Sequence, residues 1–103
     1  MPWIQVCRDD ELDEGQFRIA ETEDGEEILV ARAEGELHAV INECSHDHRG
    51  FDGGCIEADL LICPRHGARF CLRNGKALTP PAYTDIETYP VKVEEGLIWV
   101  EAD

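Results

Sequence analysis

Short runs of apolar and β-branched residues, separated by turn residues, recur along most of this 103-residue chain. Such runs are typical of β-strands, and a glycine-containing turn between two of them predicts a β-hairpin. Residues 4–7 and 17–19 are predicted to form two shorter strands. The predicted hairpins are residues 28–33 and 37–41 around Glu34-Gly35, and residues 91–93 and 97–101 around Glu94-Glu95-Gly96.

Helical structure is expected only as a minor feature. Residues 9–15 offer at most one helical turn, and no segment of the chain reaches helix length. The pattern therefore predicts an all-β fold. The two hairpins are expected to form a framework, and the segment between them is expected to be an insertion that this framework holds in place.

Two short segments of this insertion each contain one cysteine and one histidine. Cys44-Ser45-His46 and Cys63-Pro64-Arg65-His66 are separated by sixteen residues. A Cys₂His₂ zinc finger instead places its two cysteines together and its two histidines together. With one residue of each kind per segment, two facing loops can give both cysteines to one iron and both histidines to another. That is the ligand set of a Rieske [2Fe–2S] centre.

The chain resembles a Rieske-type [2Fe–2S] ferredoxin along nearly its whole length. The resemblance implies an antiparallel β-sandwich with an inserted cluster-binding subdomain, at about residues 43–76 of a single domain spanning residues 1–103. It also implies one [2Fe–2S] cluster per chain. Cys44 and Cys63 would bind one iron, and His46 and His66 the other. Besides these four, the resemblance rests on Gly67, Arg69, Phe70, Leu72, Gly75-Lys76-Ala77-Leu78 and Pro80-Pro81-Ala82.

Several other residues have roles that the resemblance implies. Phe51 matches an apolar residue that shields the cluster from water. Gly67 suits a tight loop whose backbone N–H groups point at the sulfides, and Pro64 stiffens the same loop. Pro80 and Pro81 match a proline segment that covers the cluster. Ordinary turn and core positions would explain these residues equally well without the ligand motif.

Two pairs of positions differ from respiratory Rieske proteins. Those proteins have a disulfide between the ligand loops, where this chain has Arg49 and Arg65. They also have a serine and a tyrosine that donate hydrogen bonds to the sulfurs, where this chain has Ala68 and Phe70. Because such donors stabilise the reduced, more negative state, their absence predicts a reduction potential near the low end of the Rieske range.

The resemblance implies an electron carrier rather than an enzyme. Such a ferredoxin would pass single electrons from a flavin-containing reductase to a terminal non-haem iron oxygenase. The chain is not expected to be the oxygenase, because a mononuclear iron site needs two more histidines and a carboxylate, and only His38 and His48 are spare. Two alternatives remain open: the small subunit of an assimilatory nitrite reductase, and a structural zinc module that uses the same four side chains.

The spare histidines and cysteines have simpler interpretations. His38 lies in a predicted strand and is expected to be a hydrogen-bonded structural residue, while His48 is expected in an exposed loop. Cys7, Cys55 and Cys71 are expected to be buried free thiols, since cysteine packs as a small apolar side chain. A redox-active Cys55–Cys71 pair is the alternative, although no spacing supports it.

The net charge of −14 is large and unevenly distributed. Residues 44–76 hold five basic and four acidic residues, whereas the rest of the chain holds four basic and nineteen acidic ones. This balance argues against nucleic-acid binding, which needs a basic surface. The acidic flanks are either ordinary solvated surface or a field that steers the protein toward a basic partner.

Neither end of the chain predicts export or membrane attachment. Residues 1–5 include no basic region and no apolar run, so no signal peptide is expected. The longest apolar stretch, residues 60–63, is too short to cross a bilayer. We therefore expect a cytoplasmic monomer without a membrane anchor, in which the cysteines do not form a disulfide framework.

Overall fold

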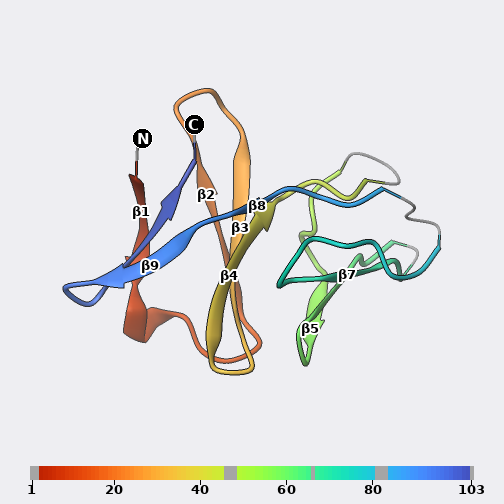
Figure 1. Cartoon of the computed structure of the whole chain (residues 1–103), viewed down its shortest axis with the longest axis horizontal. Helices are drawn as coiled ribbons and strands as arrows, with labels where there is room; N and C mark the ends of the chain where they lie inside the picture. Colours follow the sequence, from red (N-terminus) through yellow and green to blue (C-terminus); the bar gives the residue numbers. More distant parts are fainter. Residues whose placement is uncertain (1–2, 46–48, 66, 81–83, 103) are drawn as a thin grey trace.

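The computed structural model describes residues 3–45, 49–65, 67–80 and 84–102. Its strands are β1 (Trp3–Arg8), β2 (Phe17–Glu21), β3 (Glu27–Ala33), β4 (Glu36–Ile41), β5 (Cys55–Glu57), β6 (Leu60–Ile62), β7 (Arg69–Cys71), β8 (Thr88–Tyr89), β9 (Val91–Glu94) and β10 (Leu97–Glu101). They form three antiparallel sheets with the orders β1-β10-β9, β2-β3-β4-β8 and β5-β6-β7 (Figure 1). Helix is limited, in the described residues, to one 3₁₀ turn at Asp9–Glu11. The predicted all-β fold is therefore confirmed.

Both predicted hairpins are present with two-residue turns. In the β3–β4 hairpin Ala33 lies opposite Glu36, so that Glu34 and Gly35 make the turn with φ angles of 53° and 76°. The β9–β10 turn repeats this with Glu95 and Gly96 at 54° and 77°. Two consecutive positive φ angles match a type I′ turn, whose twist fits the right-handed twist of the strands on either side.

The sheets β1-β10-β9 and β2-β3-β4-β8 pack face to face and are called the scaffold below. Trp3 lies opposite Glu101 in the β1–β10 pair, so the two ends of the described chain lie together on the scaffold (Figure 1). The core between the two sheets contains Cys7, Leu12, Ile28, Val30, Ala39, Ile98, Val100 and Ala102.

The third sheet, β5-β6-β7, is called the inserted sheet and lies on the side of β4 away from β1 and β9 (Figure 1). It shares a second core with the sheet β2-β3-β4-β8, on the face of that sheet that points away from the first core. In β3, Ile28 and Val30 belong to the first core, while Leu29 and Ala31 belong to the second. A strand buried on both faces does not need to alternate apolar and polar residues. This explains the unbroken apolar run of β3.

The inserted sheet is tied to the scaffold by one guanidinium group. Arg73, just after β7, pairs with Glu36 at 2.9 Å and Glu34 at 3.4 Å, both beside the β3–β4 turn. The same group lies 3.6 Å from Asp59 in the β5–β6 turn. Glu36 and Glu34 raise the pKa of Arg73 above its ordinary value, first through the hydrogen bond to Glu36. A positive charge is thus held between two hairpin turns that are distant in the sequence.

The segment that returns from the insertion to β8 lies against the inserted sheet. The Ile86 N–H donates to the Gly75 carbonyl at 2.8 Å, and the Ala77 N–H donates to the Asp85 carboxylate at 2.9 Å. Ala77 also forms a β-bridge with Phe70. The contacts of the insertion therefore continue past residue 76, and the boundary at about residues 43–76 stays a prediction.

Within the described ranges, no helix is long and apolar enough to span a membrane.

Candidate metal centre

Two of the four predicted ligands are described, and both are buried thiols. Cys44 follows β4 and is 0% exposed, while Cys63 follows β6 and is 1% exposed. Both belong to the second core, and neither forms a disulfide. His46 and His66 lie outside the described residues, as does His48. The structure therefore brings the two cysteines into one core, and the histidine ligands remain a prediction.

Two hydrogen bonds close the first ligand loop, which is the loop that carries Cys44. The Cys44 N–H donates to the Arg49 carbonyl at 2.7 Å. At the base of the loop, the Phe51 N–H donates to Oδ1 of Asn42 at 2.9 Å. Asn42 directly follows β4 and is 6% exposed, so this side chain is a buried polar contact at the point where the scaffold ends and the loop begins.

The second ligand loop, which carries Cys63, is equally tight. The Cys63 N–H donates to the Ala68 carbonyl at 2.8 Å, and the Gly67 N–H donates back to the Cys63 carbonyl at 3.1 Å. Gly67 has a φ of 72°, which favours glycine. The predicted tight loop is confirmed. The Gly67 N–H is used inside the loop, and the expectation that N–H groups of this loop point at the sulfides stays a prediction.

A hydrogen bond joins the two loops at the positions where respiratory Rieske proteins have a disulfide. Nη2 of Arg65, in the second loop, donates to the Arg49 carbonyl of the first loop at 3.3 Å. The same carbonyl accepts the Cys44 N–H. The backbone of the first loop is thus bonded both to the cysteine that it carries and to the loop that faces it.

The surroundings of the two thiols are apolar and buried. Phe51 and Phe70 are both 0% exposed, with ring centroids 5.5 Å apart and ring planes at 82°. Ala68 is also fully buried in the same core. The prediction that Phe51 shields this region from water agrees with its position. Ala68 and Phe70 line the core without any hydroxyl, as their identities require.

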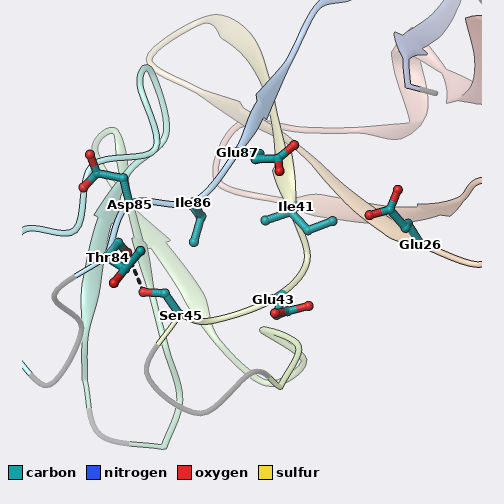
Figure 2. A pocket seen from close by; sticks show the side chains of 8 residues that line it. All are labelled: Glu26, Ile41, Glu43, Ser45, Thr84, Asp85, Ile86 and Glu87. Carbon is teal, nitrogen blue, oxygen red and sulfur yellow. Dashed lines mark hydrogen bonds between the residues drawn. The ribbon is translucent and has the colours of Figure 1, made fainter.

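A third segment flanks the first ligand loop. The Ser45 hydroxyl donates to the Thr84 carbonyl, which holds residues 84–87 beside that loop (Figure 2). Pro80 is exposed, and Pro81 lies outside the described residues, so the predicted proline cover stays a prediction.

The surface groove between this segment and the end of β4 is acidic. Its side chains come from the β2–β3 turn, the end of β4, the first ligand loop and residues 84–87 (Figure 2). Burial and then the carboxylates of Glu87 and Glu26 raise the pKa of the nearby Tyr89 to about 12. This shift agrees with a negative potential on this side of the molecule. The groove is lined by Glu26, Ile41, Glu43, Ser45, Thr84, Asp85, Ile86 and Glu87.

The remaining cysteines follow the prediction only in part. Cys7 is buried, and burial raises the pKa of its thiol. Cys71 is half-buried and Cys55 is exposed, so the prediction that all three are buried is wrong. Cys55 and Cys71 lie on strands that flank β6 from opposite sides, which places them about 10 Å apart or more. A disulfide cannot span that distance, so the alternative of a Cys55–Cys71 pair is also wrong.

His38 and Asn42 show what the sequence interpretation missed. His38 lies in β4 as predicted, but its Nε2 is buried and has no hydrogen-bond partner among the described residues, so the prediction of a fully hydrogen-bonded histidine is wrong for this atom. Asn42 was not singled out in the sequence. The available signal was its place between an apolar strand and the Cys44 motif, where a polar residue has no reason to be buried unless it bonds to the loop.

These residues fit a [2Fe–2S] cluster. Soft thiolate ligands are required on one of the two irons, and Cys44 and Cys63 are buried in one core with neither of them in a disulfide. The two loops that carry them are closed and joined to each other. The chemistry of these two side chains and their place in one core suit a cluster at the edge of the second core.

Known proteins match this chain along most of its length. A family model described as Rieske [2Fe-2S] domain matches residues 2–90. The 3-phenylpropionate/cinnamic acid dioxygenase ferredoxin subunit of Photorhabdus laumondii is 39% identical over 101 residues, which cover 97% of this chain and 94% of the relative. The solved ferredoxin of carbazole 1,9a-dioxygenase from Nocardioides aromaticivorans has a TM-score of 0.91 and 28% identity, with 100% of both chains covered.

A second kind of protein shares the fold. The putative NADH-dependent nitrite reductase small subunit from Mycobacterium tuberculosis has a TM-score of 0.83 and 25% identity, over 96% of this chain and 93% of that chain. The curated relatives, however, are named as ferredoxins, which are electron carriers and not enzymes. The cofactor is a [2Fe–2S] cluster, as the family model states. From its ligand motif, its fold and these matches, the chain belongs to the Rieske [2Fe–2S] domain family, as an electron-carrying ferredoxin.

Proposed function

We propose that this ferredoxin carries single electrons from a flavin-containing reductase to a terminal non-haem iron oxygenase. The names of its relatives support this assignment, since several are ferredoxin components of dioxygenase systems. Within this proposal Cys44 and Cys63 bind one iron, and His46 and His66 bind the other. We also propose that the protein works in the cytoplasm as a monomer, in agreement with the sequence.

The observation that carries the proposed site is the burial of both cysteines beneath two joined loops. When bound, the cluster accepts one electron and returns it. The chain supplies the conditions for that exchange. Phe51 and Phe70 keep water away from the thiolate side, and the loop hydrogen bonds limit how far Cys44 and Cys63 can move between the two redox states. The histidine side would be where electrons enter and leave.

The acidic groove supports a partner with a basic surface. Four carboxylates, those of Glu26, Glu43, Asp85 and Glu87, lie beside the first ligand loop. A concentration of one charge beside an electron-exit site raises the encounter rate with an oppositely charged partner, and salt weakens the effect. The proposal therefore expects electron transfer to slow as ionic strength rises.

The small subunit of a nitrite reductase remains the second candidate. The structural similarity to the protein from Mycobacterium tuberculosis favours it. Against it stand the dioxygenase ferredoxins among the curated relatives, with 39% and 38% identity in two of them. The zinc module is not supported, because the family cofactor is a [2Fe–2S] cluster.

Stopped-flow reduction tests the proposal directly. The holoprotein is mixed with NADH and the purified flavin-containing reductase of its own organism, and loss of visible absorbance is followed. We expect one electron per chain, and rapid reoxidation on addition of the terminal oxygenase with its substrate. Reduction that proceeds only with a nitrite reductase large subunit, and no reoxidation by the oxygenase, would instead establish the second candidate.

A matched pair of charge variants tests the groove in the same assay. Glu43→Gln/Asp85→Asn removes two charges from the groove, and Asp13→Asn/Glu95→Gln removes two charges from exposed positions outside it. We expect the groove variant to slow the second-order rate severalfold at low salt and the outer variant to have much less effect. Equal slowing would show that net charge, and not the groove, attracts the partner.

A further inference from the structure

We propose that Asn42 is the positioning residue of the cluster site, because it anchors the first ligand loop to the scaffold. It lies two residues before Cys44, directly after β4, and only 6% of its surface is exposed. Among the described residues, Asn42 and Thr22 are the buried polar ones. The inference rests on the proposed role of Cys44 as a ligand.

The side chain of Asn42 is bonded at both ends. Its Nδ2 donates to Oε1 of Glu27 at 3.1 Å, and its Oδ1 accepts the Phe51 N–H at 2.9 Å. A carboxylate only accepts and a backbone N–H only donates, so these partners determine the orientation of the amide. The Asn42 N–H also donates to the Glu27 carbonyl at 2.8 Å. Asn42 is therefore fixed to the first residue of β3 and in turn fixes Phe51.

Through Phe51, Asn42 influences both ligand loops. The bond from Asn42 to Phe51 closes residues 42–51 into one loop that contains Cys44. The Phe51 ring packs edge-on against Phe70, which follows the second ligand loop in β7. A shift of the Phe51 backbone would therefore move the first loop and disturb the packing beneath the second loop.

Gly50 shows how closely the loop lies on Asn42. A Cβ atom at position 50 would lie 2.8 Å from Nδ2 of Asn42, closer than a Cβ normally approaches another atom. The loop backbone therefore rests on the asparagine amide, with no space for a larger residue. A polar residue of this length is needed at position 42 to reach both Glu27 and the Phe51 N–H.

The proposed role predicts a change in the electronic properties of the cluster as well as in stability. Without the Asn42 side chain, the Phe51 N–H is left buried and unbonded, which favours opening of the loop toward water. Solvent exposure stabilises the reduced, more negative cluster, so the reduction potential should rise. A residue that only stabilised the scaffold would lower the melting temperature without changing the potential.

The test variant is Asn42→Ala, examined as holoprotein and as apoprotein. We expect its cluster to pass into an iron chelator at least tenfold faster than in the wild type, followed by visible absorbance. Film voltammetry should give a higher midpoint potential. In the apoprotein, amide hydrogen exchange of Phe51 by NMR should accelerate at least tenfold, because the bond to Asn42 does not depend on the cluster.

Arg32→Met is the matched control. Arg32 lies at the other end of β3 and bonds the carbonyls of Leu12 and Asp9, away from both ligand loops. The Arg32→Met variant should have a lower melting temperature than the wild type, with an unchanged reduction potential and an unchanged rate of cluster release. If Asn42→Ala lowers the melting temperature like Arg32→Met but does not change the potential or cluster release, Asn42 is an ordinary structural residue and the inference is overturned.

Two further variants cover the remaining outcomes. If Asn42→Ala does not fold, Glu27→Ala removes the partner that orients the Asn42 amide and should give the same changes at smaller size. Unchanged potential and cluster release in Glu27→Ala would then overturn the inference.

Cys44→Ser separates this inference from the proposed ligand set. A Cys44→Ser protein that keeps an unaltered cluster refutes the ligand assignment, whereas cluster loss in Cys44→Ser with no effect of Asn42→Ala refutes the role of Asn42 alone.

Discussion

The scaffold and the ligand region are held together in different ways. Scaffold hairpins depend on residues close in sequence, such as the Glu34-Gly35 and Glu95-Gly96 turns between paired arms. The ligand region depends on bonds between distant residues. The Ser45 hydroxyl binds the Thr84 carbonyl, and Arg65 reaches the backbone of the facing loop. The difference indicates that local sequence determines the two hairpins of the scaffold, while the site forms only when several segments meet.

The largest effect is expected from removing one proposed ligand. His66→Ala should abolish the visible absorbance and the EPR spectrum of the cluster, because the second iron loses half of its protein ligands. The scaffold should still fold, since its hairpins do not involve residue 66. Far-UV circular dichroism and the two cluster spectra check both halves of this expectation.

His48→Ala is the control for that experiment, because His48 lies two residues from His46 and is the histidine most easily mistaken for a ligand. This variant should keep both spectra. Loss of the cluster in His48→Ala, or its retention in His66→Ala, would show that the ligand assignment is wrong.

Two glycine variants compare the ligand region with the scaffold, because the two glycines have nearly the same positive φ angle. Gly75, beside the inserted sheet, and Gly96, in the scaffold, have φ angles of 75° and 77°. A Cβ at Gly75 would lie 2.0 Å from the Ile86 carbonyl oxygen, whereas a Cβ at Gly96 would have no neighbour within 4 Å in the described part of the chain. We expect Gly96→Ala to cost about 1 kcal/mol through its backbone conformation alone. Gly75→Ala should cost about 3 kcal/mol because of the added clash.

Urea unfolding of the two holoproteins measures these free energies. Equal values would mean that the return segment at Ile86 can move away at little cost in free energy. Contacts between residues distant in sequence would then matter less for the ligand region than the structure indicates. A smaller value for Gly75→Ala than for Gly96→Ala would contradict the comparison altogether.

Removal of the cluster should affect the two regions unequally. The ligand loops have few apolar residues of their own, and metal binding commonly contributes to folding in such cases. We expect the apoprotein to melt at a lower temperature than the holoprotein. Residues 44–76 should lose most of their protection from hydrogen exchange, except the Phe51 amide, which keeps the part that its bond to Asn42 provides. Strand β3 should keep its protection because both of its faces are buried. Equal melting of the two forms, or equal exchange in both regions, would contradict this expectation.

The sequence predicted the scaffold well because its signals are local. Glycine turns between strand-forming runs specified both hairpins, and the paired Cys/His segments identified the cofactor. Burial of individual side chains was predicted less well. Cys55 is exposed because it alternates outward on a short edge strand, and such alternation over three residues is too brief to recognise. The Asn42–Phe51 and Arg65–Arg49 bonds connect loops whose approach only the folded chain creates.

The reduction potential should show the effect of the two hydroxyl groups that respiratory Rieske proteins have and that this ligand region lacks. We expect a wild-type midpoint near the low end of the Rieske span, roughly −150 mV. Ala68→Ser/Phe70→Tyr adds hydroxyl donors in the core around the cysteines and should raise the potential by many tens of millivolts, on the order of the tuning that hydrogen bonds to sulfur provide. Ala39→Ser, which adds a hydroxyl in the scaffold core, is the control and should leave it unchanged. A wild-type value well above zero would refute the argument.

The smallest effect is expected from Glu14, which belongs to the scaffold. Its carboxylate accepts the N–H groups of Gly35 and Glu34 at the β3–β4 turn, and these bonds hold the pKa of Glu14 below its ordinary value. A carboxyl whose pKa is lowered by folding stabilises the fold above its unfolded pKa, about 4.3, and this stabilisation is lost as the pH falls through the folded value. Glu14→Gln should therefore melt slightly below the wild type at pH 7, and the difference should shrink as the pH falls below about 4.3 and through the lowered pKa of Glu14. Since the turn lies at the end of β4 opposite to the first ligand loop, the reduction potential of this variant should equal that of the wild type. A pH-independent difference in melting would show that the side chain acts through its shape and not its charge.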